Sequence, residues 1–188
     1  MAKDDQQEAY EKLLSASLAR AIDFLRFAET KNAALLTFSS AWILASINLL
    51  TTDKPLPPGF KSALSIVVLL FAISALVAVI SLLPKLKLSD FVGTTARPKN
   101  LLYFGDVAGM EIGMFKERVR ERYMPSVDRS ATDAYLEDLA TQSAVVSQIA
   151  DRKFRLFDWG ARLAAIAVLV VMWPASIIIC TWLRGALG

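Results

Sequence analysis

The side chains on which most enzymes depend are scarce in this chain of 188 residues. It contains no histidine, which removes the commonest general base and the commonest metal ligand together. Its one cysteine, Cys180, lies in an apolar run, so an intramolecular disulfide is impossible and no zinc or iron–sulfur spacing exists. No glycine-rich phosphate loop follows a strand, and the acidic residues form no recognisable metal motif. We therefore expect neither an enzyme nor a bound metal or cofactor.

Two lysines stand where a charge is unusual. Lys153 lies three or four positions from apolar residues on both sides, which places it on the apolar stripe of a predicted helix. Lys31 precedes a long apolar run. Snorkelling toward lipid headgroups would satisfy either ammonium, as would pairing with Glu29, Asp151 or Asp158. The functional interpretation is a cationic pair that faces an anionic ligand between helices. For Lys153 both interpretations stay open, and for Lys31 we favour the first.

Three uncharged runs are long enough to cross a membrane, since a helix needs about 20 apolar residues to span the hydrocarbon core. They cover residues 32–52, 62–84 and 163–183. The chain is 55% hydrophobic with a mean hydropathy of +0.44, too apolar for an ordinary soluble domain of this size. A long charged helix precedes the first run, which is therefore not a signal peptide. The composition predicts an all-α integral membrane protein with three transmembrane helices.

The placement of lysine and arginine predicts the orientation. Eighteen of the 21 lie before the first span or between the second and third, and three lie on the other side. Because cytoplasmic loops carry the excess of positive charge, we expect the N-terminus and the central segment in the cytoplasm and the C-terminus outside. The expected order is a cytosolic helix (1–31), transmembrane helix 1 (32–52), an external turn (53–61), transmembrane helix 2 (62–84), a cytosolic helical segment (85–162), transmembrane helix 3 (163–183) and an external tail (184–188). The side chains expected at the membrane interface are Lys31, Lys85, Lys87 and Trp159.

Long helices are expected to extend the first and last spans into water. No proline or glycine interrupts residues 2–53, so one helix can run from the cytoplasm through the first span. It carries a heptad seam formed by Leu14, Leu18, Ala21, Leu25, Ala28, Asn32 and Leu35. The expected neighbour of this seam is the helix of residues 130–157, which starts with a capping-box pattern at 130–133. That helix either continues into the last span or meets a second helix near residues 158–160. A short basic helix is expected over 111–124, ended by Pro125.

Three stretches in order resemble the transmembrane effectors of the pyrimidine cyclase antiphage system (Pycsar). They are residues 28–33 (AETKNA), residues 100–108 (NLLYFGDVA) and residues 148–153 (QIADRK). Glu29 replaces the usual aspartate of the first stretch, where Asn32 also intervenes before the last alanine. Tyr103 stands where phenylalanine is common. The resemblance covers nearly the whole chain in order and spacing.

What the resemblance implies is an effector in the inner membrane of a bacterium, acting in abortive infection. A partner pyrimidine cyclase makes cyclic CMP or cyclic UMP, and the effector senses that nucleotide and impairs the membrane. The resemblance implies no nucleic-acid partner. We expect a homo-oligomer, because three thin helices make a poor pore alone. Two alternatives remain: a constitutive oligomeric scaffold that recruits a cytosolic protein, or an effector gated by another cyclic nucleotide or oligonucleotide.

The segment 85–162 is the candidate sensor. Arginine suits a phosphate through paired donors, and an aromatic face suits a base. The candidate ligand-binding residues are Lys99, Asn100, Tyr103, Phe104, Arg118, Arg120 and Lys153. Core packing is the competing interpretation for the two aromatic residues, and a solvated helix face near anionic lipid is the competing interpretation for the basic run.

Overall fold

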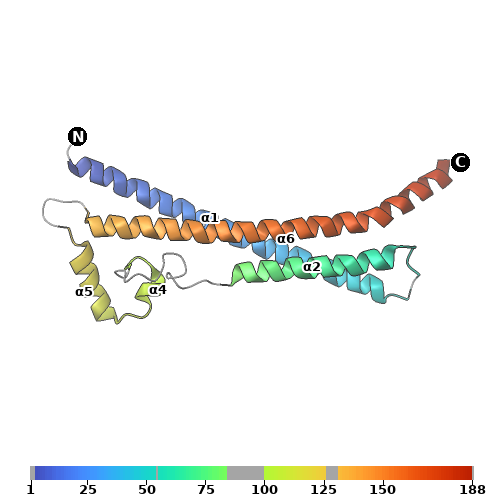
Figure 1. Ribbon diagram of the computed structural model, residues 1–188, viewed down its shortest axis with the longest axis horizontal. Coiled ribbons are helices and arrows are strands. Elements are labelled where there is room, and N and C mark those ends of the chain that lie inside the picture. Colours follow the sequence, from blue (N-terminus) through green and yellow to red (C-terminus); the bar gives the residue numbers. More distant parts are fainter. Residues whose placement is uncertain (1–2, 54, 84–99, 126–130, 188) are drawn as a thin grey trace. The chain divides into compact units, whose positions relative to one another are not determined.

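The computed structural model describes residues 3–53, 55–83, 100–125 and 131–187. Within these ranges the regular structure is entirely helical (Figure 1). The helices are α1 (Lys3–Thr51), α2 (Phe60–Leu82), α4 (Phe104–Val107), α5 (Ile112–Tyr123) and α6 (Asp133–Leu187). The expectation of an all-α chain is confirmed for the described residues.

Two of these helices are far longer than a membrane is thick. α1 has 49 residues and α6 has 55. At about 1.5 Å per residue they measure roughly 70 and 80 Å, more than twice the roughly 30 Å of a hydrocarbon core. The chain from residue 133 onward is one helix, which decides between the two alternatives left by the sequence. Its first turn is capped by Thr132, whose Oγ1 accepts the backbone N–H of Tyr135 at 3.2 Å.

The chain divides into two compact units. We call residues 1–27 and 84–151 the polar unit, and residues 28–83 and 152–188 the membrane unit. Both α1 and α6 contribute to each unit. The two units are described separately below.

In the membrane unit, α2 packs against parts of α1 and α6. The buried cluster is formed by Leu35, Val67, Phe71, Ala78, Ala164 and Ala167. Phe71 is fully buried, and the ring of Trp42 stacks on it with centroids 5.7 Å apart and planes 14° apart. Stacked aromatic rings and small alanines let three helices approach closely in this core.

The helices of the membrane unit approach closely at Gly160 of α6. A Cβ atom at this position would lie 2.7 Å from Cδ2 of Leu35, so a side chain requires Leu35 to move. The Ser74 hydroxyl of α2 donates to the Gly160 carbonyl at 2.9 Å and lies 3.2 Å from the Ser39 hydroxyl of α1. These buried serines join the three helices by hydrogen bonds, as small polar residues do in membranes.

The outer surface of the membrane unit is covered by large apolar side chains. Those that are well exposed include Leu44, Ile47, Ile66, Leu69, Ile73, Leu76, Ile166, Leu169 and Met172. α1, α2 and α6 each contain a stretch long and apolar enough to cross a membrane. An exposed apolar surface of this extent is stable only in lipid. The prediction of three membrane-spanning helices is therefore supported by both composition and packing.

In the polar unit, α1 lies against the N-terminal half of α6. The Ser17 and Ser143 hydroxyls are 3.1 Å apart, and the Gln7 amide donates to the Ala131 carbonyl at 3.2 Å. Ala21, from the predicted heptad seam of α1, is buried here. Asn32 of the same seam, in the membrane unit, donates to the Lys153 carbonyl of α6, the helix that the sequence indicated as the neighbour.

Candidate functional site

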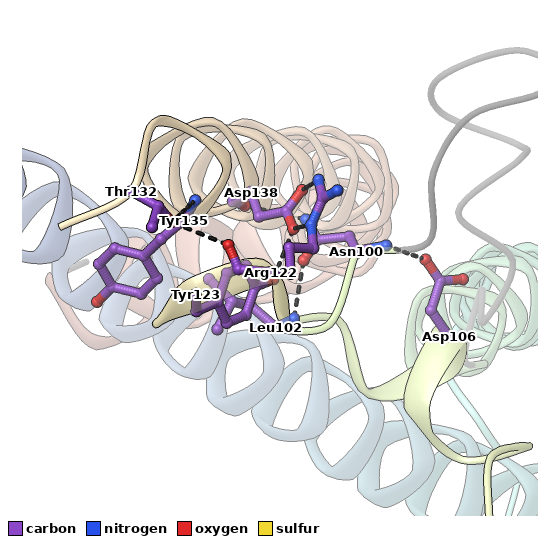
Figure 2. A network of polar contacts seen from close by, with 8 residues as sticks. All are labelled: Asn100, Leu102, Asp106, Arg122, Tyr123, Thr132, Tyr135 and Asp138. Atoms are coloured by element: carbon purple, nitrogen blue, oxygen red, sulfur yellow. Dashed lines mark hydrogen bonds and ion pairs between the residues drawn. The ribbon is translucent and has the colours of Figure 1, made fainter. Parts of the chain in front are cut away.

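A buried carboxylate organises the polar unit. Asp138 of α6 is 3% exposed and accepts two hydrogen bonds from the Arg122 guanidinium of α5, at 2.8 and 3.1 Å (Figure 2). The Tyr123 hydroxyl donates to the same carboxylate at 2.5 Å. A bidentate arginine and a phenol together satisfy the charge of Asp138.

Asn100 connects the segment before α4 to this network. Its side chain is fully buried. Nδ2 donates to the backbone carbonyl of Asp138 at 2.9 Å, and Oδ1 accepts the N–H of Leu102 at 2.8 Å. The backbone N–H of Asn100 donates to Oδ2 of Asp106 at 2.9 Å (Figure 2). Asn100 therefore fixes the turn 100–106 against α6.

The end of α5 is bound to the start of α6 by a second set of contacts. The Thr132 hydroxyl donates to the Arg122 carbonyl at 3.1 Å, and the rings of Tyr123 and Tyr135 meet edge to face at 5.6 Å. Burial, followed by the hydrogen bond to Asp138, raises the pKa of Tyr123 well above its usual value. The hydrogen bond to Asp138 likewise raises the pKa of Arg122. Both groups keep their protons at any physiological pH, so this network is a fixed structural element.

Part of the α5 surface takes no part in this hydrogen-bond network. Arg118 and Arg120 are exposed, and they make no ion pair within the described residues. Phe104 is 59% exposed, whereas Tyr103 is 2% exposed and packs with Val145 of α6. Of the two aromatic candidates, the structure thus places Tyr103 in the core and Phe104 at the surface. Arg118 and Arg120 thus offer exposed guanidinium groups, and Phe104 offers an exposed ring.

Lys153 lies in the membrane unit, where it is 8% exposed. Its ammonium lies 3.0 Å from Oε1 of Glu29, the first of the partners considered from the sequence. The backbone carbonyl of Lys153 accepts a hydrogen bond of 3.2 Å from Nδ2 of Asn32, which also donates to the carbonyl of Ala28 at 2.8 Å. Oδ1 of Asn32 is buried without a partner among the described residues. This polar contact joins α1 to α6 within a largely apolar unit.

The remaining predicted residues are distributed as follows. The Lys31 ammonium lies 5.2 Å from the centre of the Phe157 ring, a cation–π distance. Trp159 is 64% exposed, and the Arg162 guanidinium lies 6.0 Å from the centre of its ring. Lys85, Lys87 and Lys99 lie outside the described residues.

The membrane unit also contains an apolar groove of about 500 Å³ between α1 and α6. Its lining is Leu35, Phe38, Ala161, Ala164, Ala165, Val168 and Leu169. The lining offers no charged or hydrogen-bonding side chain, so the groove does not suit a nucleotide.

Arg122, Tyr123 and Asp138 were not among the residues selected from the sequence. One signal for Asp138 was present, because it lies seven positions before the buried Val145 and so shares a helix face with it. An acidic residue on a buried face requires a partner. No spacing rule identifies that partner as Arg122, because the two residues belong to different helices.

The chain has three candidate spans, and two of the helices that contain them continue into a unit held by the ion pair between Arg122 and the buried Asp138. These features define an integral membrane protein with a polar module. Residues 13–180 match the family model described as the Pycsar effector protein domain. The chain is 41% identical over 169 residues to the Pycsar effector protein RsPycTM of a Rhizobium species, an alignment that covers 90% of this chain and 96% of the relative. The chain therefore belongs to the Pycsar effector family, as its three motif stretches indicated. No solved structure matches it.

Proposed function

We propose that this protein is a non-catalytic antiphage effector that binds cyclic CMP or cyclic UMP made by a partner pyrimidine cyclase. Binding leads the oligomeric effector to impair the inner membrane, so that the infected cell stops growing before phage matures. The N-terminus and the polar unit face the cytoplasm, where the nucleotide is made, and the C-terminus lies outside. The excess of lysine and arginine on the polar side supports this orientation.

The observation that carries the proposal is the continuity of α1 and α6. Each helix belongs to both the polar unit and the membrane unit without a break. A ligand that favours one packing of these helices in the polar unit therefore acts on the same helices that cross the membrane. Family membership supplies the antiphage role, and the two shared helices supply a route from sensing to the membrane.

The ligand chemistry proposed is an anionic phosphate with a stackable base. Arg118 and Arg120 offer exposed guanidinium groups, and Phe104 offers an exposed ring. Asn100 and Tyr103 hold the turn that precedes Phe104, and Lys99 adjoins it in sequence. Lys153 belongs to the membrane unit, where its ammonium pairs with Glu29, and its role in ligand binding stays a prediction.

Calorimetry on the detergent-purified protein tests the sensing step, with cyclic AMP as the control ligand. We expect saturable binding of cyclic CMP or cyclic UMP and none of cyclic AMP. Removing one charge-assisted contact costs roughly 1.5–3 kcal/mol, so Arg118→Ala should weaken binding about 10- to 150-fold. Lys12→Ala is the matched control, because Lys12 is an exposed cation on α1 that pairs with Glu8.

Vesicles that contain the protein and a trapped dye test the membrane step. The selective nucleotide should release dye from vesicles with the unaltered chain and not from vesicles with Arg118→Ala. If a folded protein binds none of the three nucleotides, the sensing proposal fails and a scaffold that recruits a cytosolic protein is favoured. If Arg118→Ala and Lys153→Ala both bind with unchanged affinity, the site assignment fails.

A further inference from the structure

The core of the membrane unit contains two rows of buried polar side chains. On α1, Asn32, Ser39 and Ser46 follow one another at intervals of seven residues, and each is at most 1% exposed. Because seven residues make about two helical turns, these three side chains share one face of α1. On α2, Ser74 and Ser81 have the same spacing and are at most 2% exposed. Both rows therefore face the interior of the membrane unit and not the surrounding lipid.

Two contacts set the register of α1 against α2. The Ser39 and Ser74 hydroxyls are 3.2 Å apart, and about one turn further along α1 the ring of Trp42 stacks on the ring of Phe71. Both contacts fit antiparallel helices, in which a step forward along α1 matches an equal step backward along α2. This register defines a layered interface whose three layers are about 10 Å apart. The first layer contains Asn32 and Ser81, the second Ser39 and Ser74, and the third Ser46 and Val67.

The layers differ in how their polar atoms are satisfied. The second layer is joined by hydrogen bonds that end at the Gly160 carbonyl of α6. In the first layer, Oδ1 of Asn32 and the Ser81 hydroxyl are buried without a hydrogen-bond partner among the described residues, and so is the Ser46 hydroxyl in the third. Polar groups in membrane spans are unfavourable unless they are paired or hydrated, and they mark the paths of water and ions. Helix packing explains the second layer but not the unpaired oxygens of the other two.

Apolar side chains separate the layers of the layered interface. Leu35 and Ala78 belong to the buried cluster and lie, by the same register, between the first and second layers. The stacked rings of Trp42 and the fully buried Phe71 lie between the second and third. Apolar constrictions between polar sites close a water path by excluding water. The layered interface therefore has the composition of a closed path, with polar groups at three depths and apolar side chains between them.

We propose that the layered interface between α1 and α2 is the route by which water and small hydrophilic solutes cross the membrane when the effector is active. This inference rests on the proposed function, in which nucleotide binding supplies the opening. Separation of the Trp42 and Phe71 rings joins the second layer to the third, and water then completes the hydrogen bonds of the unpaired oxygens. The three layers extend over about 21 Å of a hydrocarbon core of roughly 30 Å. Each copy of the chain contains such a route between its own helices.

Thiol accessibility in vesicles tests the layered interface. Cys180 is the only cysteine, so Cys180→Ala gives a cysteine-free chain in one step. Ser46→Cys and Ser81→Cys, each in that background, place a thiol of similar size in the third and first layers. Ile47→Cys and Ile80→Cys are the matched controls, because each lies one residue away on the same helix and is exposed on the outer surface. We expect cyclic CMP or cyclic UMP, whichever binds, to speed modification of positions 46 and 81 by a charged methanethiosulfonate reagent at least tenfold, and to leave the controls unchanged.

Removing the unpaired hydroxyls gives a second measurement. Ser46→Ala combined with Ser81→Ala should slow nucleotide-triggered dye release at least fivefold, because the route loses polar groups at two depths. The same chain should not melt at a lower temperature in detergent, because neither hydroxyl has a partner among the described residues. Ser65→Ala is the matched control, since Ser65 is exposed on α2, and it should release dye at the unaltered rate. A lower melting temperature with unchanged dye release would mean that the hydroxyls only support packing, and would overturn the proposal.

The outcomes separate the route from the proposed function. If a chain binds nucleotide and releases dye while positions 46 and 81 react no faster than without nucleotide, the route is refuted and the proposed function stands. If positions 46, 47, 80 and 81 all react faster to the same extent, general disruption of the surrounding lipid explains the leak and the route is again refuted. If the unaltered chain binds no pyrimidine nucleotide or releases no dye, the proposed function fails and the route fails with it.

Discussion

Replacing Asn100 with alanine should loosen the polar unit and leave the membrane unit intact. The side chain is fully buried and makes two hydrogen bonds to backbone groups, at 2.8 Å to Leu102 and 2.9 Å to Asp138. Alanine removes both bonds and leaves the Leu102 N–H without this acceptor, whereas the Asp138 carbonyl keeps the intrahelical bond of α6. An unsatisfied N–H costs about 1–3 kcal/mol and the lost bond to the Asp138 carbonyl about 0.5–1.5 kcal/mol, so we expect a loss of about 2–4 kcal/mol.

Amide hydrogen exchange read by mass spectrometry measures this loss locally. At 1.4 kcal/mol per tenfold, 2–4 kcal/mol corresponds to exchange that is about 30- to 1000-fold faster in α5 and in the first turns of α6. Peptides from α2 serve as the internal reference, because α2 belongs to the membrane unit. Gln148→Ala is the matched control on α6, where the Gln148 side chain is exposed. Acceleration of less than threefold in α5 of Asn100→Ala would refute the view that Asn100 holds this unit together.

Three further predictions concern other contacts. Glu29→Gln should destabilise the membrane unit by about 1–2 kcal/mol in thermal melting in detergent, because it leaves the buried Lys153 ammonium unpaired. Lys153→Met should destabilise it by less, because it removes that ammonium. A larger loss for Lys153→Met than for Glu29→Gln would contradict this explanation. Gly160→Ala should lower the stability of the membrane unit by about 1–3 kcal/mol, because the new methyl group forces Leu35 to move. Adding Leu35→Ala to the same chain should recover part of that loss. If the stability changes of the two substitutions simply add in the double variant, the clash is refuted. The pKa of Tyr123 is raised in the folded state, so its contribution to stability is complete below the unfolded pKa of about 10 and is lost as the pH rises above that value. Tyr123→Phe should therefore reduce the loss of hydrogen-exchange protection that the polar unit shows at alkaline pH. An alkaline profile identical to that of the unaltered chain would count against this assignment.

The long helices and the spans were predictable because their signals are local and repeated. The absence of glycine and proline over residues 2–53 predicted one helix, and α1 runs from Lys3 to Thr51. The apolar runs predicted the three spans by length and composition alone. The heptad seam predicted which face of α1 is buried, and Ala21, Ala28, Asn32 and Leu35 from this seam are buried.

The polar network was not predictable because its contacts connect residues from different elements. Arg122 stood out only as one of several basic residues on a short helix, and nothing local separates it from Arg118 or Arg120. Only tertiary packing places the partly buried Arg122 against Asp138 and leaves the other two exposed. Asn100 was selected as a candidate ligand-binding residue, whereas in the structure its side-chain bonds reach Leu102 and Asp138. The ligand-binding roles of these residues stay predictions.

The polar unit is assembled from two pieces of chain separated by the first two spans. Its N-terminal piece ends at residue 27, and its second piece is complete only at residue 151. A ribosome adds about 5–20 residues per second, so the first helix waits roughly 6–25 seconds for the segment that buries it. During that interval the first two spans can already be inserted while the proposed sensing unit does not yet exist. Under the proposed function, a nascent chain therefore binds the nucleotide only after the second piece of the polar unit has been made.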